Sequence, residues 1–112
     1  MITTKFGRDS EDRAIEFLIN SGFIIIERNF YAKKMGEIDI IAKKDNILHF
    51  IEVKSSANKK YQPIYNITPT KLRRVINSTH YYLKVKNLDV AFCIDALIIT
   101  DGNIEFIENI TI

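Results

Sequence analysis

Two short apolar segments carry charged residues at positions where a buried strand would normally have none. Residues 36–43 and 47–54 are rich in isoleucine, yet they include Asp39, Glu52 and Lys54. Burying a charged group costs free energy unless a partner compensates for it. A divalent metal ion, which prefers oxygen ligands, and a phosphate group are such partners. The two segments therefore predict a β-hairpin that carries a metal- and phosphate-binding cluster.

A two-residue turn sets the register of this hairpin. Asp45 and Asn46 both tolerate the positive φ values that such turns require. With that turn, Asp39 lies directly opposite Glu52. Facing Cβ atoms are about 4.5–5.5 Å apart, so the two carboxylates can share one cation. Without a cation, one of them must take up a proton, because facing carboxylates repel each other.

The same register places four charged side chains on one face, because side chains alternate along a strand. These residues are Glu37, Asp39, Glu52 and Lys54. Apolar residues continue both faces: Ile41 and Phe50 on the charged face, and Ile38, Ile40, Ile51 and Val53 on the other. Two largely apolar faces favour a central hairpin with a polar cluster at one end. The alternative is a solvated hairpin face with a cross-strand salt bridge.

The composition is typical of a single globular domain over residues 1–112. The chain is 46% hydrophobic and 27% charged, and its length can bury a substantial core. The single cysteine, Cys93, cannot form an internal disulfide, which favours a reducing compartment. No apolar run is long enough to span a bilayer, and the N-terminus lacks the apolar stretch of a signal peptide. We therefore expect a cytoplasmic protein that does not bind membranes.

The net charge of +2 conceals an uneven distribution. Residues 33–86 contain twelve lysines and arginines against four acidic residues, whereas residues 87–112 contain five acidic residues and no lysine or arginine. A basic region around an acidic cluster can attract the backbone of a polyanion and direct it to a metal site. Nucleic acid is therefore the expected partner, although lysine doublets taken alone are also typical of a solvated surface.

Periodicity and end signals predict the element order α-β-β-β-α-β-β. The expected helices cover about residues 8–21 and 68–84, and the expected strands cover 23–30, 36–43, 47–54, 90–100 and the segment from 104 onward. Gly22 suits the end of the first helix, and Thr68 suits the cap of the second, ahead of Pro69. This order predicts an α/β domain with a mixed central sheet flanked by two helices.

Charged residues on both expected helices are candidate site residues. Lys71, Arg73 and Arg74 lie in the first turns of the second helix, where cations oppose the helix dipole. Their placement indicates a neighbouring anion, which makes them candidate substrate-binding residues, although an exposed helix tolerates them at small cost. Glu11 places an acid at the end of the buried stripe of the first helix. It is either a site acid or a complement to the helix dipole.

Four other residues with chemical potential have simpler interpretations. His49 alternates onto the face opposite the carboxylate cluster and is expected to be a core histidine, while His80 has no ligand partner at metal-binding spacing. Cys93 is expected to pack as a small strand residue. Asp95 is expected to have a structural partner, with Arg28 as one candidate. The sequence contains no zinc-binding spacing, phosphate-binding glycine loop or nucleophile elbow.

The central motifs resemble those of a known family. Residues 36–42 read Gly-Glu-Ile-Asp-Ile-Ile-Ala and residues 50–54 read Phe-Ile-Glu-Val-Lys, which is similar to the signature of the YraN-like family of small bacterial proteins. Further landmarks of that family are matched by Gly7, Glu11, Arg28-Asn29, Lys71, Tyr82-Leu83 and Asp95. The Asp…Glu-x-Lys pattern also resembles the PD-(D/E)XK nuclease superfamily, which implies the restriction-endonuclease-like fold.

The resemblance implies a metal-dependent nuclease or nuclease-like protein that hydrolyses phosphodiesters in DNA, with branched or single-stranded DNA as possible substrates. The implied ligands of Mg²⁺ or Mn²⁺ are Asp39, Glu52 and the backbone carbonyl of Val53. Lys54 would position the attacking water or steady the phosphate. Glu11 would be a further acid beside the metal, and Lys71 would contact a phosphate. Isolated domains of this kind often act in pairs, so a homodimer is also expected.

Two positions depart from the family pattern. Ser56 and Cys93 stand where that family usually has arginine, two residues after the motif lysine and two before the late aspartate. Arginine is the residue best suited to bidentate phosphate contacts. The departures favour an alternative function, in which the chain is a non-catalytic nucleic-acid-binding or interaction module that retains the nuclease fold.

Overall fold

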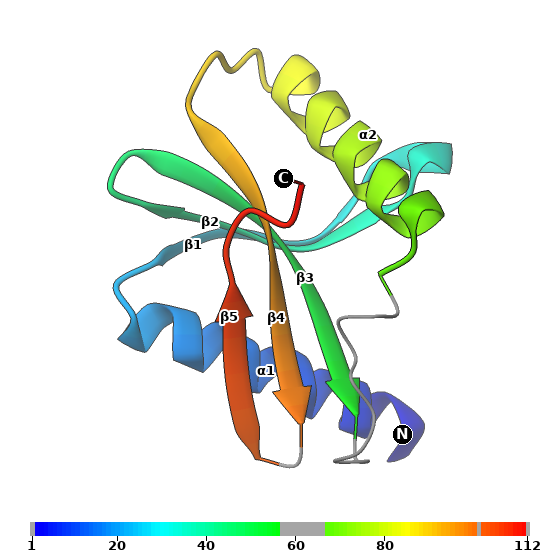
Figure 1. The fold of residues 1–112 in the computed structure, drawn as a ribbon, viewed down its shortest axis with the longest axis vertical. Coiled ribbons are helices and arrows are strands. Elements are labelled where there is room, and N and C mark those ends of the chain that lie inside the picture. The colour runs from blue at the N-terminus through cyan, green and yellow to red at the C-terminus, as the bar shows by residue number, and fades with distance from the viewer. Residues whose placement is uncertain (1, 57–66, 101, 112) are drawn as a thin grey trace.

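In the part of the chain that the structure describes, five strands form one mixed sheet, and two α-helices pack on its opposite faces (Figure 1). The computed structural model describes residues 2–56, 67–100 and 102–111. The elements are α1 (Ile2–Asn20), β1 (Ile24–Tyr31), β2 (Glu37–Lys44), β3 (Ile47–Ser56), α2 (Pro69–Val85), β4 (Phe92–Thr100) and β5 (Asn103–Ile107). The predicted order and the mixed sheet between two helices are confirmed. A short 3₁₀ helix, η1 (Lys33–Met35), was not predicted.

The strands lie across the sheet in their chain order. All neighbours are antiparallel except β3 and β4, which are parallel and are connected through α2. In Figure 1, α1 passes behind the lower parts of β3, β4 and β5, whereas α2 contacts β2 and η1. Among the described residues, no helix is long and apolar enough to cross a membrane.

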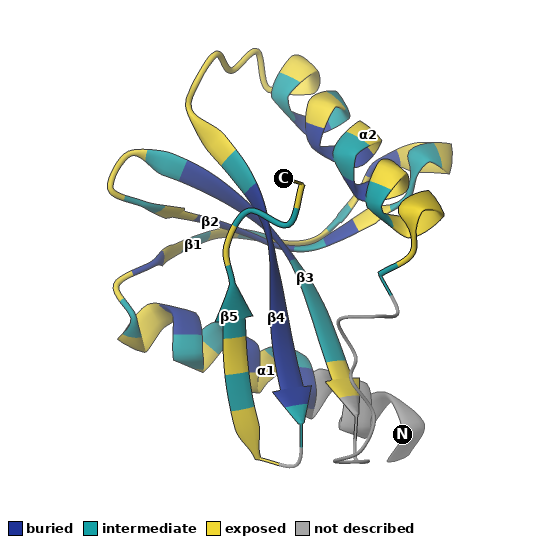
Figure 2. Ribbon diagram, viewed as in Figure 1, coloured by how far each residue is buried: buried dark blue, intermediate teal, exposed yellow. Residues whose placement is uncertain are grey.

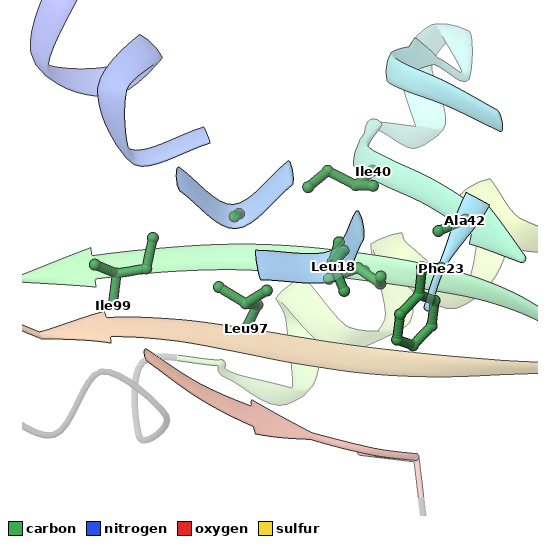
Figure 3. Close-up of a cluster of buried hydrophobic side chains, with 8 residues drawn as sticks. Leu18, Phe23, Ile40, Ala42, Leu97 and Ile99 are labelled. Carbon is green, nitrogen blue, oxygen red and sulfur yellow. The ribbon is translucent and has the colours of Figure 1, made fainter. Parts of the chain in front are cut away.

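Each helix covers its own hydrophobic core, and β4 is buried along most of its length between the two (Figure 2). The core beneath α1 contains Ala14, Leu18, Phe23, Ile40, Ala42, Ile51, Leu97 and Ile99 (Figure 3). The core beneath α2 contains Ile38, Ile41, Leu48, Phe50, Val75, Tyr82 and Ile94. Side chains that alternate along β2 and β3 supply both cores, so these strands lie in the centre of the fold.

The hairpin turn has the predicted conformation. Asp45 and Asn46 have φ values of 53° and 64°, as a two-residue turn with both central residues at positive φ requires. Lys44 accordingly pairs with Ile47. The register derived from the turn is therefore confirmed for the pairs nearest to it.

The sheet is irregular where β1 and β2 approach η1. Asn29 has a φ of 53° and lies between the pairs Arg28–Ile40 and Phe30–Ile38. At this point the side chains of β2 switch from one face of the sheet to the other. Ile40 packs beneath α1, whereas Ile38 packs beneath α2. The prediction that Ile38 and Ile40 share a face is wrong, because it assumed uninterrupted alternation.

The end of α1 follows the predicted signal. Gly22 has a φ of 95°, and the N–H of Phe23 donates to the carbonyl of Leu18 at 2.9 Å, which is the Schellman arrangement. The start of α1 differs from the prediction, since the helix begins at Ile2, well before residue 8.

The predicted cap of α2 is present, since the Thr68 hydroxyl accepts a hydrogen bond from the Lys71 N–H at 3.1 Å. Thr68→Ala removes that acceptor, so we expect the free energy of unfolding, measured by urea denaturation, to fall by about 1 kcal/mol. Thr70→Ala is the matched control, because Thr70 is exposed in the same turn. An equal loss in both variants would contradict the capping role.

Candidate functional site

β2 and β3 separate at the end of the hairpin that is far from its turn (Figure 1). Their pairs run from the turn as far as Ile40 with Ile51, one position short of Asp39 and Glu52. At that point Asp39 Oδ2 accepts the N–H of Val53 at 2.8 Å. A side-chain oxygen thus replaces the backbone acceptor that a continued hairpin would supply. We call this position the strand fork.

The carboxyl groups of Asp39 and Glu52 interact with each other at the strand fork, and both are partly buried. Burial raises the pKa of Asp39, although the hydrogen bond from Val53 opposes that change. Burial, the charge of Asp39 and a hydrogen bond with Asp39 raise the pKa of Glu52 to about 8. The pair therefore holds a proton near neutral pH, and a bound cation would relieve the same repulsion.

Cations border these carboxylates on the α2 side. Lys54 Nζ lies 3.8 Å from Glu52 Oε2, and burial together with the neighbouring Lys71 lowers the pKa of Lys54. Lys71 and Arg74 line a cleft of about 170 Å³ together with Glu37 and Glu52. Acids with raised pKa beside a lysine with lowered pKa are typical of functional sites.

The remaining candidates on α2 lie elsewhere. Arg73 is exposed and does not line the cleft that Lys71 and Arg74 border. Tyr82 is buried and packs edge-on against Phe30, so its role is packing. The structure thus brings two of the three predicted cations to the carboxylates.

Glu11 is close to the strand fork but is held by other partners. Its Oε1 accepts hydrogen bonds from Arg28 at 3.0 Å and from Asn29 at 2.9 Å. Its charge contributes to the raised pKa of Asp39. Because α1 begins at Ile2, Glu11 lies in the middle of the helix, and the helix-dipole interpretation is wrong.

Three residues that the sequence did not connect form one cluster on the α1 face of the sheet. His49 Nδ1 lies 2.6 Å from Asp95 Oδ2, and Cys93 Sγ lies 3.1 Å from the same nitrogen. His49 is a buried core residue as predicted, but the suggested pairing of Asp95 with Arg28 is wrong, since Arg28 pairs with α1. The only sequence signal is the two-residue spacing of Cys93 and Asp95, which puts both on one face of a strand.

The fold and the strand fork define a small α/β protein with a carboxylate–lysine cluster where two central strands part. Residues 10–99 match the model of the Uncharacterised protein family UPF0102, and the chain belongs to that family. It is 61% identical to a UPF0102 protein of Sulfurovum sp. (strain NBC37-1) over 107 residues, which cover 96% of this chain and 94% of that protein. It is 57% identical to UPF0102 protein WS0451 of Wolinella succinogenes over 106 residues, 95% of each chain. The resemblance to the YraN-like family is confirmed at this level.

The raised pKa of Glu52 predicts a pH dependence of stability. The unfolded chain releases this proton near the ordinary pKa of 4.5, whereas the folded protein keeps it up to about pH 8. The folded state binds more protons between these values, so the free energy of unfolding falls as the pH rises through this window. Urea denaturation at several pH values in this window should show that the free energy of unfolding of Glu52→Gln changes less with pH than that of the unsubstituted protein.

Glu105→Gln is the matched control for this experiment, because Glu105 is exposed on β5. Its profile should follow that of the unsubstituted protein. A Glu52→Gln profile that also follows the unsubstituted protein would contradict the assignment of the pH dependence to Glu52.

Proposed function

We propose that this protein is a metal-dependent nuclease or nuclease-like protein, with the restriction-endonuclease-like fold of the PD-(D/E)XK superfamily, that hydrolyses phosphodiesters in DNA. The observation that carries the proposal is the strand fork, where Asp39, Glu52 and Lys54 meet although each is partly withdrawn from water. A cytoplasmic location and action as a homodimer belong to the same proposal.

The donor set at the strand fork fits Mg²⁺ or Mn²⁺. Asp39 and Glu52 offer carboxylate oxygens, which these ions prefer, and the pKa of each is raised chiefly by burial, a cost that a bound cation would offset. The N–H of Val53 points to Asp39, and the N–H and C=O of one strand residue point to the same side. Asp39, Glu52 and the carbonyl of Val53 would therefore hold the ion.

The chain's own residues supply the remaining functions. The bound ion would polarise a phosphate oxygen and acidify a water molecule. Lys54 has a lowered pKa, which increases the fraction that can accept a proton from the attacking water, and in its charged form it steadies the developing negative charge. Lys71 and Arg74 would hold phosphates across the cleft. Arg73 would contact the nucleic acid outside it, and Glu11 would add negative charge from α1.

A non-catalytic nucleic-acid-binding module is the second candidate, which the two departures from the family pattern suggested. The side chain of Ser56 lies outside the described part of the structure. Cys93 Sγ is within hydrogen-bond distance of His49 Nδ1 on the α1 face, whereas Glu52 lines the cleft on the α2 face. Position 93 therefore does not border the carboxylates, so its departure does not weaken the case for an enzyme.

Calorimetric titration of Mn²⁺ or Mg²⁺ tests the metal site directly. We expect one saturable binding event in the unsubstituted protein and at least about tenfold weaker binding in Asp39→Asn and Glu52→Gln, because each variant removes one charged oxygen ligand. Glu105→Gln should bind like the unsubstituted protein. No binding, even with a single-stranded oligonucleotide present to complete the ligand shell, would remove the metal from the proposal.

Cleavage assays separate the two candidate functions. With Mn²⁺ and labelled branched or single-stranded DNA, Asp39→Asn, Glu52→Gln and Lys54→Ala should each reduce the initial rate by roughly 10²–10³-fold, because each removes a group that stabilises the transition state. Equal rates in all variants would indicate a contaminant. Salt-sensitive DNA binding that chelator leaves unchanged, with no cleavage, would support the binding module instead.

A further inference from the structure

We infer that His49, Cys93 and Asp95 form a second metal site, for a single ion of the Zn²⁺ type, on the face of the sheet opposite the strand fork. The pairing of β3 and β4 brings them together. Cys93 lies directly opposite His49 in this parallel pair, and Asp95, two residues further along β4, points to the same face as Cys93. One potential ligand atom from each residue lies within 4.8 Å of the other two.

The distances from Cys93 Sγ to the other two residues are close to the distances between ligand atoms in a tetrahedral zinc site. Zinc–ligand bonds of about 2.0–2.3 Å place neighbouring ligand atoms roughly 3.3–3.6 Å apart. Cys93 Sγ lies 3.1 Å from His49 Nδ1 and 3.3 Å from Asp95 Oδ1. The 2.6 Å between His49 Nδ1 and Asp95 Oδ2 is shorter, because a hydrogen bond joins them. An ion in place of that proton requires this pair to separate by roughly 0.7 Å.

The three donors select the kind of ion. Imidazole nitrogen, thiolate sulfur and carboxylate oxygen are the ligands of Zn²⁺, whereas Mg²⁺ and Ca²⁺ take oxygen ligands. Coordination removes the proton from the Cys93 thiol and releases it to solvent. With Nδ1 bound to the ion, the ring proton of His49 would be on Nε2.

The surroundings hold the donors in place. The side chains of His49 and Asp95 are 5% and 0% exposed. The N–H of Asn109 donates to Asp95 Oδ1 at 2.8 Å, which fixes the carboxylate from the segment after β5. Outer hydrogen bonds of this kind orient metal ligands in proteins.

A pocket of about 390 Å³ gives access to the cluster. His49 and Cys93 lie in its wall, beside the aromatic rings of Phe23 and Phe106. Glu108 also lines the pocket and adds negative charge near Cys93. Three protein ligands and an opening to a pocket match zinc sites whose fourth position is taken by water or a small ligand.

Titration with Co²⁺ tests this site, because cobalt bound to thiolate gives a charge-transfer absorption. Cys93 is the only cysteine of the chain, so the band can arise only there. We expect the band to saturate at one equivalent, to vanish on addition of Zn²⁺ and to persist in excess Mg²⁺. Cys93→Ala should lose the band, and His49→Ala should bind Co²⁺ at least about tenfold more weakly.

Two further measurements make the result decisive. Glu52→Gln should keep the full band, which distinguishes this site from the proposed nuclease site. In the unsubstituted protein, Zn²⁺ should slow alkylation of Cys93 at least about tenfold, so this result does not depend on a variant that folds. Absence of both the band and the slowing would overturn the proposal and leave the three residues as a hydrogen-bonded core cluster.

Discussion

The hydrogen bond from the Val53 N–H to the Asp39 carboxylate allows two central strands to part. A buried N–H left without an acceptor would cost roughly 1–3 kcal/mol. Because the side chain of Asp39 supplies that acceptor, β2 leaves toward η1 while β3 continues beside β4 (Figure 1). The gap that results is where Glu52 and Lys54 meet the first turns of α2. The path of β2 and the position of the carboxylate site therefore depend on the same side chain.

The sheet separates the two proposed metal sites. Glu52 and His49 are three residues apart on β3, so they face opposite sides, one toward α2 and the other toward α1. The α2 side combines carboxylate oxygens with cations and suits a hard ion beside a phosphate. The α1 side combines imidazole, thiol and carboxylate, which suits a softer ion. Because the donor sets differ in chemistry as well as place, we expect metal binding at one proposed site to be independent of metal binding at the other.

Local rules predicted the hairpin turn, the end of α1 and the cap of α2, whereas the features set by distant chain segments were missed. The turn at Asp45 and Asn46 fixes the register by its own φ values, so the approach of Asp39 to Glu52 was predictable from sequence. The change of face between Ile40 and Ile38 lies beside the positive φ of Asn29 on the neighbouring strand β1, a feature that no local pattern of β2 reveals. The pairing of Cys93 with His49 could not be predicted from local sequence either. The two parallel strands are joined by a long crossover through α2, so no turn fixes their register.

The two carboxylates of the strand fork differ in what they contribute to the fold. Asp39 satisfies a backbone donor and therefore has a structural reason for its position. Glu52 has no comparable benefit among the described contacts, because Lys54 lies 3.8 Å away and burial raises the pKa of Glu52 to about 8. A glutamine or an apolar residue there would remove the cost of burying an ionisable carboxyl group beside Asp39. Departures from local stability rules concentrate at functional sites, so Glu52, more than Asp39, argues that the strand fork serves chemistry and not only folding.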